Sequence, residues 1–184
     1  EPYAVAKIAG IKMCEAYNRQ YNTQFIAVMP TNLYGPNDNF DLETSHVLPA
    51  LIRKFHEAKQ RSEVLKNNRN AYVTLWGTGN PRREFLHVDD LADAALFLMN
   101  NYNENEIINV GVGKEITIKE LAGIIAEIIG FKGEIRYDPS KPDGMQLKRL
   151  DTSRLSFLGW DSKISLKEGI EDTYHWYLKT KKDK

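Results

Sequence analysis

The chain has 184 residues, of which 42% are hydrophobic and 27% charged, as in a globular protein that forms one domain or a lobe of a larger one. Its 25 basic and 25 acidic residues cancel, so no net charge favours binding to nucleic acid or to an anionic membrane. The single cysteine, Cys14, excludes an intrachain disulfide and a cysteine-rich metal cluster. We find no signal peptide and no apolar run long enough to span a membrane. Together with the single cysteine, these observations favour a cytoplasmic protein.

The first elements can be predicted from periodicity. Residues 3–21 carry apolar side chains at helical spacing, and Pro2 suits a first helical turn. Residues 24–30 are predicted to form an apolar strand, and a loop rich in Asn, Gly and Pro follows at 31–40. A second helix is expected to begin at Ser45.

Further along, the polar segment 59–70 is predicted to be a loop. Extended segments are expected at 72–76, 84–88, 107–110 and 134–137. Asp89 or Asp90 is expected to cap the next helix. Two capping boxes, Thr117-Ile-Lys-Glu120 and Ser165-Leu-Lys-Glu168, predict two more helices, the first ending at Gly130, and a short helix is expected at 151–157.

This alternation of strands and helices predicts an α/β fold with some mixed strand pairing. No Gly-rich loop follows an initial strand, so the usual phosphate-binding βαβ units of a nucleotide-binding domain are absent from these residues.

A tyrosine and a lysine stand at helical spacing near the start of the chain. Tyr3-x-x-x-Lys7 is one of three such matches, with Tyr137–Lys141, which contains a proline, and Tyr177–Lys181, near the end of the chain. Only the first lies on a long helix that leads into an apolar strand and a polar loop. Residues i and i+4 share a helix face, and an ammonium beside a phenol makes the phenol a better acid–base group.

Three segments in order resemble one family. Tyr3-x-x-x-Lys7, the strand ending MPTNLYGP and the segment REFLHVDDLADA are similar to the extended short-chain dehydrogenase/reductases, which include sugar-nucleotide epimerases, dehydratases and reductases. The longer segments 29–58, 76–94 and 140–160 resemble the members that convert GDP-4-keto-6-deoxy-D-mannose to GDP-L-fucose with NADPH. Those enzymes epimerise C3 and C5 and reduce the C4 ketone.

The resemblance implies a role for individual residues. It makes Tyr3 the general acid for C4 reduction, Lys7 the residue that holds the nicotinamide ribose and assists the tyrosine, and His46 a proton-transfer residue in epimerisation. The implied NADP(H)-binding residues are Tyr3, Lys7, Pro30, Thr31, Asn32, Leu33 and His46. The implied contacts to the GDP-sugar are Lys54, Trp76, Arg83 and Lys148. No metal is implied.

The resemblance also implies an organisation. Residues 1–36 would be the remnant of a dinucleotide-binding domain, and 37–184 would be mostly a substrate-binding lobe, with 77–110 partly returning to the core domain. The family's catalytic serine and cysteine and its Gly-rich loop have no counterpart here, so the chain resembles a C-terminal portion. We expect this portion to be inactive by itself and the whole enzyme to be a homodimer.

Alternatives remain open at this point. The chain could be another sugar-nucleotide epimerase or dehydratase, or a non-catalytic sugar-nucleotide-binding fragment. Trp76 could pack in the core instead of contacting substrate. Cys14 is expected to be a buried apolar filler, and His56, His87 and His175 are expected to be structural.

Overall fold

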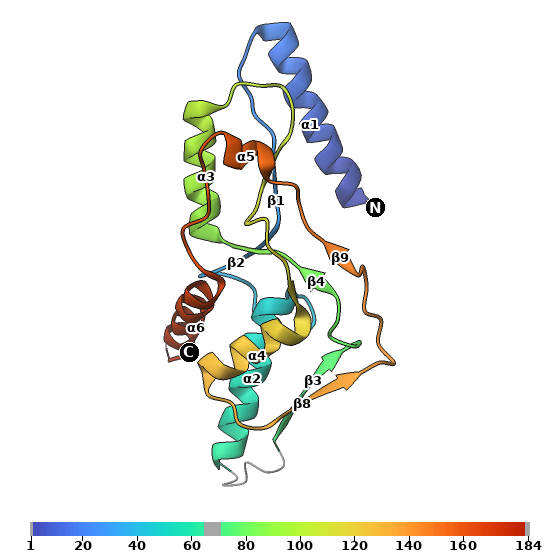
Figure 1. Cartoon of the computed structure of the whole chain (residues 1–184), viewed down its shortest axis with the longest axis vertical. Helices are drawn as coiled ribbons and strands as arrows, with labels where there is room; N and C mark the ends of the chain where they lie inside the picture. The colour runs from blue at the N-terminus through green and yellow to red at the C-terminus, as the bar shows by residue number, and fades with distance from the viewer. Residues whose placement is uncertain (1, 65–70, 183–184) are drawn as a thin grey trace.

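The computed structural model describes residues 2–64 and 71–182. The helices are α1 (Pro2–Tyr21), α2 (Val47–Val64), α3 (Val88–Asn101), α4 (Ile118–Ile129), α5 (Ser153–Phe157) and α6 (Leu166–Lys182). The strands are β1 (Val28–Pro30), β2 (Asn32–Tyr34), β3 (Tyr72–Trp76), β4 (Arg82–Arg83), β5 (Phe85–His87), β6 (Ile108–Val110), β7 (Ile116–Thr117), β8 (Glu134–Asp138) and β9 (Leu147–Lys148). In Figure 1, α1, α3 and α5 form the upper part, and α2, α4 and α6 the lower part.

Most strand pairs are parallel. β1 pairs with β6, β2 with β5 and β3 with β8, each in parallel, while β4 lies between antiparallel β7 and parallel β9. Parallel strands need a long crossover, which here contains a helix in each of these three pairs. The predicted α/β class with mixed pairing is therefore confirmed.

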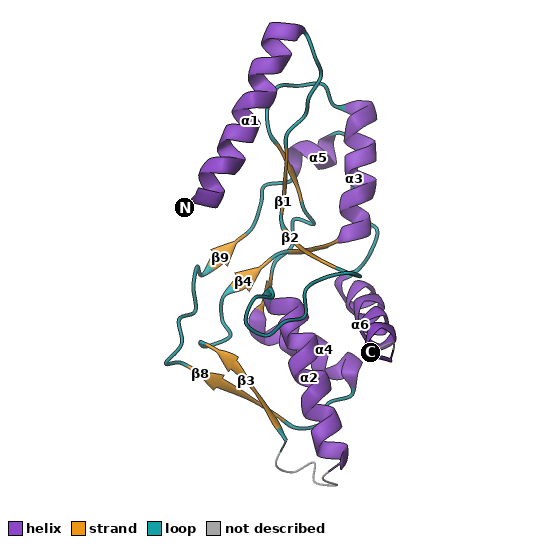
Figure 2. Cartoon of the chain, turned by 180° about the vertical axis from the view of Figure 1, so that it is seen from behind, coloured by secondary structure: helices purple, strands orange, loops and turns teal. Residues whose placement is uncertain are grey.

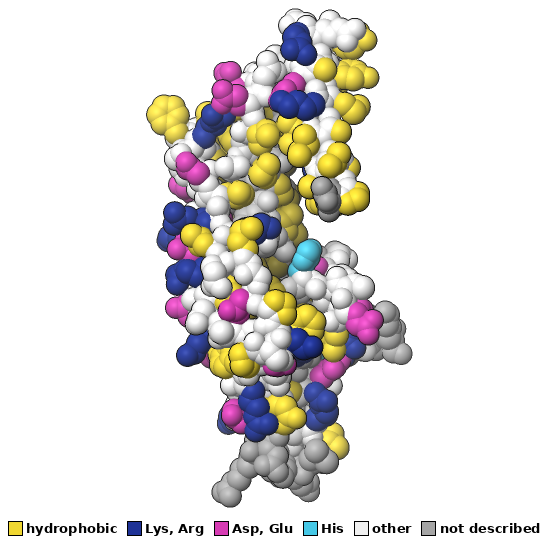
Figure 3. Space-filling view, turned by 90° about the vertical axis from the view of Figure 1, so that its right-hand side faces the viewer, with side chains coloured by type: hydrophobic (Ala, Val, Ile, Leu, Met, Phe, Trp, Pro, Cys, Tyr) yellow, Lys and Arg dark blue, Asp and Glu magenta, His cyan; other side chains and the backbone are white. Residues whose placement is uncertain are grey.

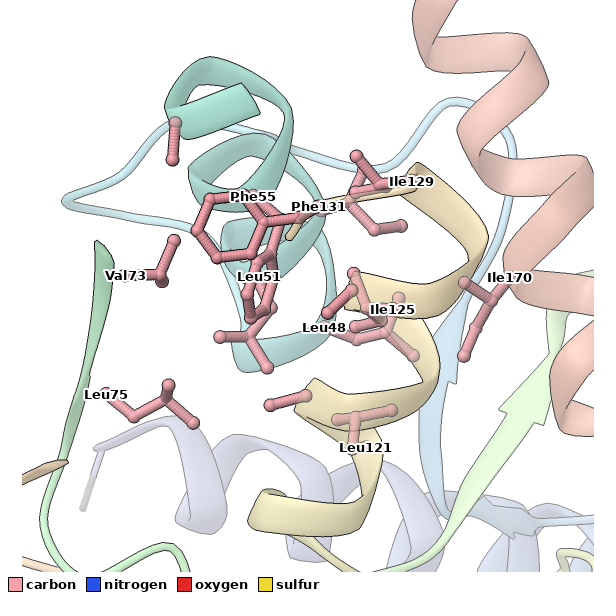
Figure 4. Close-up of a cluster of buried hydrophobic side chains, with 14 of the residues drawn as sticks. Leu48, Leu51, Phe55, Val73, Leu75, Leu121, Ile125, Ile129, Phe131 and Ile170 are labelled. Atoms are coloured by element: carbon pink, nitrogen blue, oxygen red, sulfur yellow. The ribbon is translucent and has the colours of Figure 1, made fainter. Parts of the chain in front are cut away.

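The larger hydrophobic core lies in the lower part, and we call it the lobe core (Figure 4). Helices α2 and α4 face each other there because their apolar side chains recur at helical spacing. Strand β3 and helix α6 complete the cluster. Its fully or almost fully buried members include Leu48, Leu51, Phe55, Val73, Leu75, Leu121, Ile125, Ile129 and Ile170. Burial of each large side chain contributes roughly 1.5–3 kcal/mol.

A second, smaller core lies in the upper part. It joins β5, β6, α3 and α5 through the buried side chains of Leu86, Ala94, Leu98, Tyr102, Ile108, Val110, Leu155 and Trp160. The indole of Trp160 donates a hydrogen bond to the Asp93 carboxylate at 2.8 Å, which satisfies its polar edge.

Helix α1 differs from the others because none of its described residues is buried. Figure 3 shows hydrophobic side chains (yellow) along this helix in the upper part of the molecule. Cys14, which was expected to be buried, is only half-buried. The rest of the chain covers only one side of α1, so Cys14 does not lie in a closed hydrophobic core.

Several predicted boundaries were wrong. Helix α2 begins at Val47 instead of Ser45, and it continues to Val64 because Ala58 and Ser62 still face the lobe. Residues 59–64 are therefore helical, and the rest of the predicted 59–70 loop lies outside the described residues. The predicted strand at 24–30 shortens to β1, and the following loop contains β2.

The cap of α3 is another correction. Neither Asp89 nor Asp90 is the N-cap. Nδ1 of His87 accepts a hydrogen bond from the Asp89 amide at 3.3 Å, so His87 takes that place. The Asp90 carboxylate is buried and accepts from the amides of Lys163 and Ile164, because the chain before α6 returns to this point.

Both predicted capping boxes are confirmed. The Thr117 hydroxyl accepts from the Glu120 amide at 3.0 Å, and the Glu120 carboxylate accepts from the Thr117 amide at 2.9 Å. Ser165 and Glu168 make the equivalent pair at the start of α6. Gly130 ends α4 in the left-handed conformation, with φ of 75°, as its position after the apolar stripe predicted.

Candidate functional site

Two hollows collect the residues that the sequence singled out. The first, of about 900 Å³, is lined by Tyr3, Lys7, Pro30, Thr31, Asn32, Leu33, His46 and Lys148, among others, and we call it the tyrosine cavity. The second, of about 330 Å³, is lined by Lys54, Trp76 and Arg83, with other residues of α2, β3 and the segment before β9, and we call it the tryptophan pocket. The structure thus gathers the expected cofactor residues in one cavity and divides the expected substrate residues between the two.

Tyr3 and Lys7 lie on one face at the start of α1. The Lys7 ammonium is 5.4 Å from the centre of the Tyr3 ring, as expected for residues one helical turn apart. The Tyr3 side chain is 75% exposed and stands over the tyrosine cavity. The phenol is therefore free to meet a molecule in the cavity, with a cation beside it.

The segment between β1 and β2 forms the floor of the same cavity. The Thr31 amide donates to the carbonyl of Val110 at 3.0 Å, which continues the β1–β6 pairing. The Thr31 hydroxyl and the Asn32 side-chain amide both donate to the main-chain carbonyl of Glu84, at 3.3 and 2.7 Å. These bonds hold Thr31 and Asn32 in a fixed orientation in the cavity that Tyr3 also lines.

His46 lies immediately before α2, where its carbonyl accepts from the Ala50 amide at 3.1 Å. Its side chain is exposed at the edge of the tyrosine cavity. Asp38 lines the same cavity, and one of its carboxylate oxygens is buried without a hydrogen-bond partner among the described residues. Burial raises the pKa of Asp38, and the hydrogen bond from the Asn39 amide and the nearby His46 oppose that shift.

Sequence reasoning missed Asp38. The only signal was an acidic residue in the Asn-rich loop eight positions before His46. Such loops use aspartates for turns far more often than for chemistry, and Asp38 does accept from the next amide, that of Asn39, at 2.7 Å.

The tryptophan pocket presents an aromatic face beside cations. Trp76 ends β3 with its side chain 66% exposed, so the alternative that it packs in the core is wrong. The ammonium groups of Lys54 and Lys141 lie 6.0 and 5.7 Å from its ring centre. Partial burial lowers the pKa of Lys54. A planar ring next to positive charge suits a nucleobase joined to phosphates.

Arg83 supplies a further cation to this pocket from strand β4. Its guanidinium donates to the main-chain carbonyls of Arg82 and Met145, at 2.9 and 2.6 Å. Asp143, in the same returning segment, accepts from the amide and hydroxyl of Thr78 at 2.6 and 2.8 Å. These bonds lower the pKa of Asp143 and fasten the segment along the pocket.

Lys141 and Asp143 were not singled out from the sequence as site residues. The returning segment, with its Pro-Asp-Gly turn, was the only hint that the chain crosses a pocket here. Of the remaining histidines, His56 and His87 are buried and His175 is exposed. Within 2–64 and 71–182, no cluster of metal-ligating side chains is found. No helix in this described part is long and apolar enough to cross a membrane.

The chain resembles known proteins along nearly its whole length. It is 57% identical to the probable GDP-L-fucose synthase 1 of Oryza sativa subsp. japonica over 97% of this chain and 52% of that protein. It is 51% identical to the GDP-L-fucose synthase of Escherichia coli (strain K12), over 97% and 56%. A crystal structure of a Naegleria fowleri GDP-L-fucose synthetase bound to NADP matches with a TM-score of 0.88 and 31% identity, over 98% and 56%.

These comparisons also set the extent of the likeness. The chain spans about half the length of the curated relatives it matches. The paired parallel strands and the helices between them are part of a Rossmann-type epimerase/reductase fold. The sequence model described as the NAD dependent epimerase/dehydratase family matches residues 1–111, and this chain belongs to that family.

Proposed function

We propose that this chain carries the proton-transfer and GDP-sugar-binding residues of a GDP-L-fucose synthase, which converts GDP-4-keto-6-deoxy-D-mannose to GDP-L-fucose. One observation carries the proposal. Tyr3 and Lys7 on α1, His46 before α2 and Lys148 on β9 come from three distant parts of the chain, and all of them line the tyrosine cavity. A phenol, an imidazole and two ammonium groups around one cavity provide proton donors and acceptors beside fixed positive charge.

Tyr3 is the proposed general acid for the C4 ketone. A carbonyl reduced at C4 develops negative charge on its oxygen, and the exposed Tyr3 hydroxyl can donate a proton to that oxygen. Lys7, 5.4 Å from the ring, favours the phenolate that remains.

His46 is the proposed proton carrier for epimerisation. The C4 carbonyl acidifies the C–H bonds at C3 and C5, and an imidazole at the cavity edge can give or take a proton there. Asp38 lies in the same cavity, and as a carboxylate it would attract the protonated form of His46.

The residues fit the nicotinamide half of NADP(H). The cavity of about 900 Å³ has the Thr31–Asn32 floor on one side and Tyr3 with Lys7 on the other. Pro30, Thr31, Asn32 and Leu33 would lie against the ring, and Lys7 and Tyr3 would meet the ribose. Bound there, the cofactor supplies the hydride for C4. The residue pattern that holds a pyrophosphate, a Gly-rich loop after a strand, is absent from the 184 residues.

The tryptophan pocket is the proposed site of the GDP moiety. The guanine would stack on the exposed face of Trp76, and the diphosphate would meet Lys54 and Arg83. Lys148 lies in the tyrosine cavity, so we assign it to the sugar end of the substrate. Lys54 can provide charge but not the two-pronged contact of an arginine.

We also propose that residues 1–36 belong to a dinucleotide-binding domain and 37–184 mostly to a substrate lobe, with 77–110 returning to the first. The second core supports this return, because β5, β6 and α3 pack with Ile26 and Leu33. The exposed apolar residues of α1 suit the homodimer proposed for the whole enzyme, and they suit burial under the rest of the dinucleotide-binding sheet equally. The single free cysteine is compatible with a cytoplasmic, reducing location.

Titration calorimetry of this chain with GDP, UDP and dTDP tests the substrate class. We expect GDP to bind and the pyrimidine nucleotides to bind at least tenfold more weakly, since each offers a smaller stacking surface to Trp76. Preferred binding of UDP would overturn the assignment to GDP-sugars. We expect little NADPH-dependent turnover from these residues alone, and production of GDP-fucose by the isolated chain would contradict that.

A further inference from the structure

Glu84 is a buried carboxylate that the proposed mechanism does not use. Glu84 directly follows Arg83 in the sequence, and it is 0% exposed. A charged group in the interior is costly unless its oxygens are fully hydrogen-bonded, so its contacts decide what it does.

The side chain of Glu84 accepts three main-chain hydrogen bonds. One oxygen accepts from the amides of Val112 and Gly113, at 2.6 and 2.7 Å, and the other from the amide of Leu150 at 3.0 Å. The carboxylate therefore joins the turn after β6 to the segment after β9. The fit is close, because a methyl group added at Gly111 would lie 2.3 Å from the first oxygen.

The main-chain carbonyl of Glu84 makes a second set of contacts. It accepts from the Thr31 hydroxyl at 3.3 Å and from the Asn32 side-chain amide at 2.7 Å, and both residues form the floor of the tyrosine cavity. One residue thus holds that floor through its backbone and two other segments through its side chain.

Glu84 also stands between the two hollows. Strands β4 and β9 run between the upper and lower parts in both views (Figures 1 and 2). In their parallel register Arg83 lies opposite Lys148. Arg83 lines the tryptophan pocket and Lys148 lines the tyrosine cavity. Glu84 directly follows β4, and its carboxylate accepts from the Leu150 amide just beyond β9.

We propose that Glu84 is a positioning residue that fixes Arg83 and Lys148 relative to Thr31 and Asn32, and so couples the tryptophan pocket to the tyrosine cavity. It touches neither ligand itself. This inference rests on the proposed function, because it takes GDP to be the occupant of the tryptophan pocket.

Hydrogen exchange on the unmodified chain gives the first test. The amides of Val112, Gly113 and Leu150 bond to Glu84 and line neither hollow. Saturating GDP is expected to slow their exchange at least threefold, together with that of Asn32. Unchanged exchange at all four amides, with GDP bound, would overturn the coupling.

A double-mutant cycle gives the second test. Glu84→Gln turns one acceptor oxygen into a donor against a main-chain amide, and GDP affinity is expected to fall about tenfold, as when a hydrogen bond to a charged group is lost. In an Arg83→Ala background the same change is expected to have less than a twofold effect, because its action passes through Arg83. If Glu84 acted on folding alone, the effects of Glu84→Gln and Arg83→Ala on GDP affinity would be additive. Equal losses of affinity in both backgrounds would contradict the proposal.

A matched control and a second variant complete the design. Glu134→Gln removes an exposed carboxylate of β8 and is expected to leave GDP affinity unchanged. If Glu84→Gln does not fold, Gly111→Ala replaces it as the test variant, because the added methyl group displaces the Glu84 carboxylate. If the unmodified chain does not bind GDP, the proposed substrate class fails. Positioning is then judged by whether Glu84→Gln, unlike Glu134→Gln, shifts the amide NMR signals of Asn32, Arg83 and Lys148.

Discussion

Helices α1 and α4 both carry apolar side chains at helical spacing, more clearly on one face in α4, and they lie in opposite environments. In α4 the side chains of Leu121, Ile125 and Ile129 are at most 2% exposed, because α2 and α6 cover them. In α1 no described residue is buried, and Ile8 is 57% exposed. An apolar stripe therefore does not indicate whether a helix is covered by the rest of its own chain.

The largest expected difference between the helices is in stability. Ile125→Ala opens a cavity in the lobe core and is expected to lower the free energy of unfolding by roughly 2–5 kcal/mol. The same change at Ile8, on α1, is expected to stay within about 0.5 kcal/mol. Urea unfolding of both variants measures this. Equal losses would contradict this expectation and would mean that α1 is already covered in solution by a second copy of this chain, although the homodimer is proposed only for the whole enzyme.

Exposure of Trp76, in the proposed GDP site, has a different expected consequence from exposure on α1. Trp76→Ala is expected to weaken GDP binding by about 1–3 kcal/mol, the range for base–aromatic stacking. The unfolding energy should change little, since the side chain is 66% exposed. Tyr72, on the same strand and 49% exposed, lies outside the pocket, so Tyr72→Ala should leave affinity unchanged in calorimetry. A loss at Tyr72 as large as at Trp76 would contradict this.

The capping box at the start of α4 is expected to make a smaller contribution to the free energy of unfolding than the lobe core does. Thr117→Ala removes the hydroxyl that accepts from the Glu120 amide and donates to the Glu120 carboxylate, and it is expected to cost about 1 kcal/mol. Lys119→Ala, in the same turn and exposed, should stay within about 0.5 kcal/mol. Thermal unfolding of the two variants compares them. A Thr117 variant as stable as the Lys119 variant would mean that packing alone holds this helix end.

The smallest expected effect is on pH dependence within the lobe core. Burial lowers the pKa of His56, whose Nδ1 lies 3.0 Å from the Tyr174 hydroxyl. As the pH falls below about 6.5, His56 is therefore protonated in the unfolded chain before it is protonated in the folded chain. The contribution of neutral His56 to the free energy of unfolding is fully present above that pH. It declines as the pH falls toward the lowered pKa of His56 in the folded chain. His56→Gln should flatten the decline between pH 7 and 5, and exposed His175→Gln should not, which urea midpoints can measure.

Short-range chemistry explains which parts of the fold could be predicted. The Thr117–Glu120 and Ser165–Glu168 boxes and the Gly130 stop depend on neighbours within one turn, so the sequence contains the whole interaction. The cap of α3 was missed because histidine is a rare N-cap and Asp89 and Asp90 are common ones. Asp90 instead bonds to Lys163 and Ile164, which are distant in sequence.

The candidate site divides in the same way. By itself, the sequence determined which residues are candidates, through motif spacing and resemblance to a family: Tyr3, Lys7, His46, Lys54, Trp76, Arg83 and Lys148. Only the tertiary structure decided that Lys148 joins Tyr3 in one cavity while Trp76 stands exposed in another. It also decided that Glu84, one position after Arg83, is buried and bonded to three segments. Spacing within an element is fixed by local geometry, whereas contacts between distant segments depend on how the two cores pack.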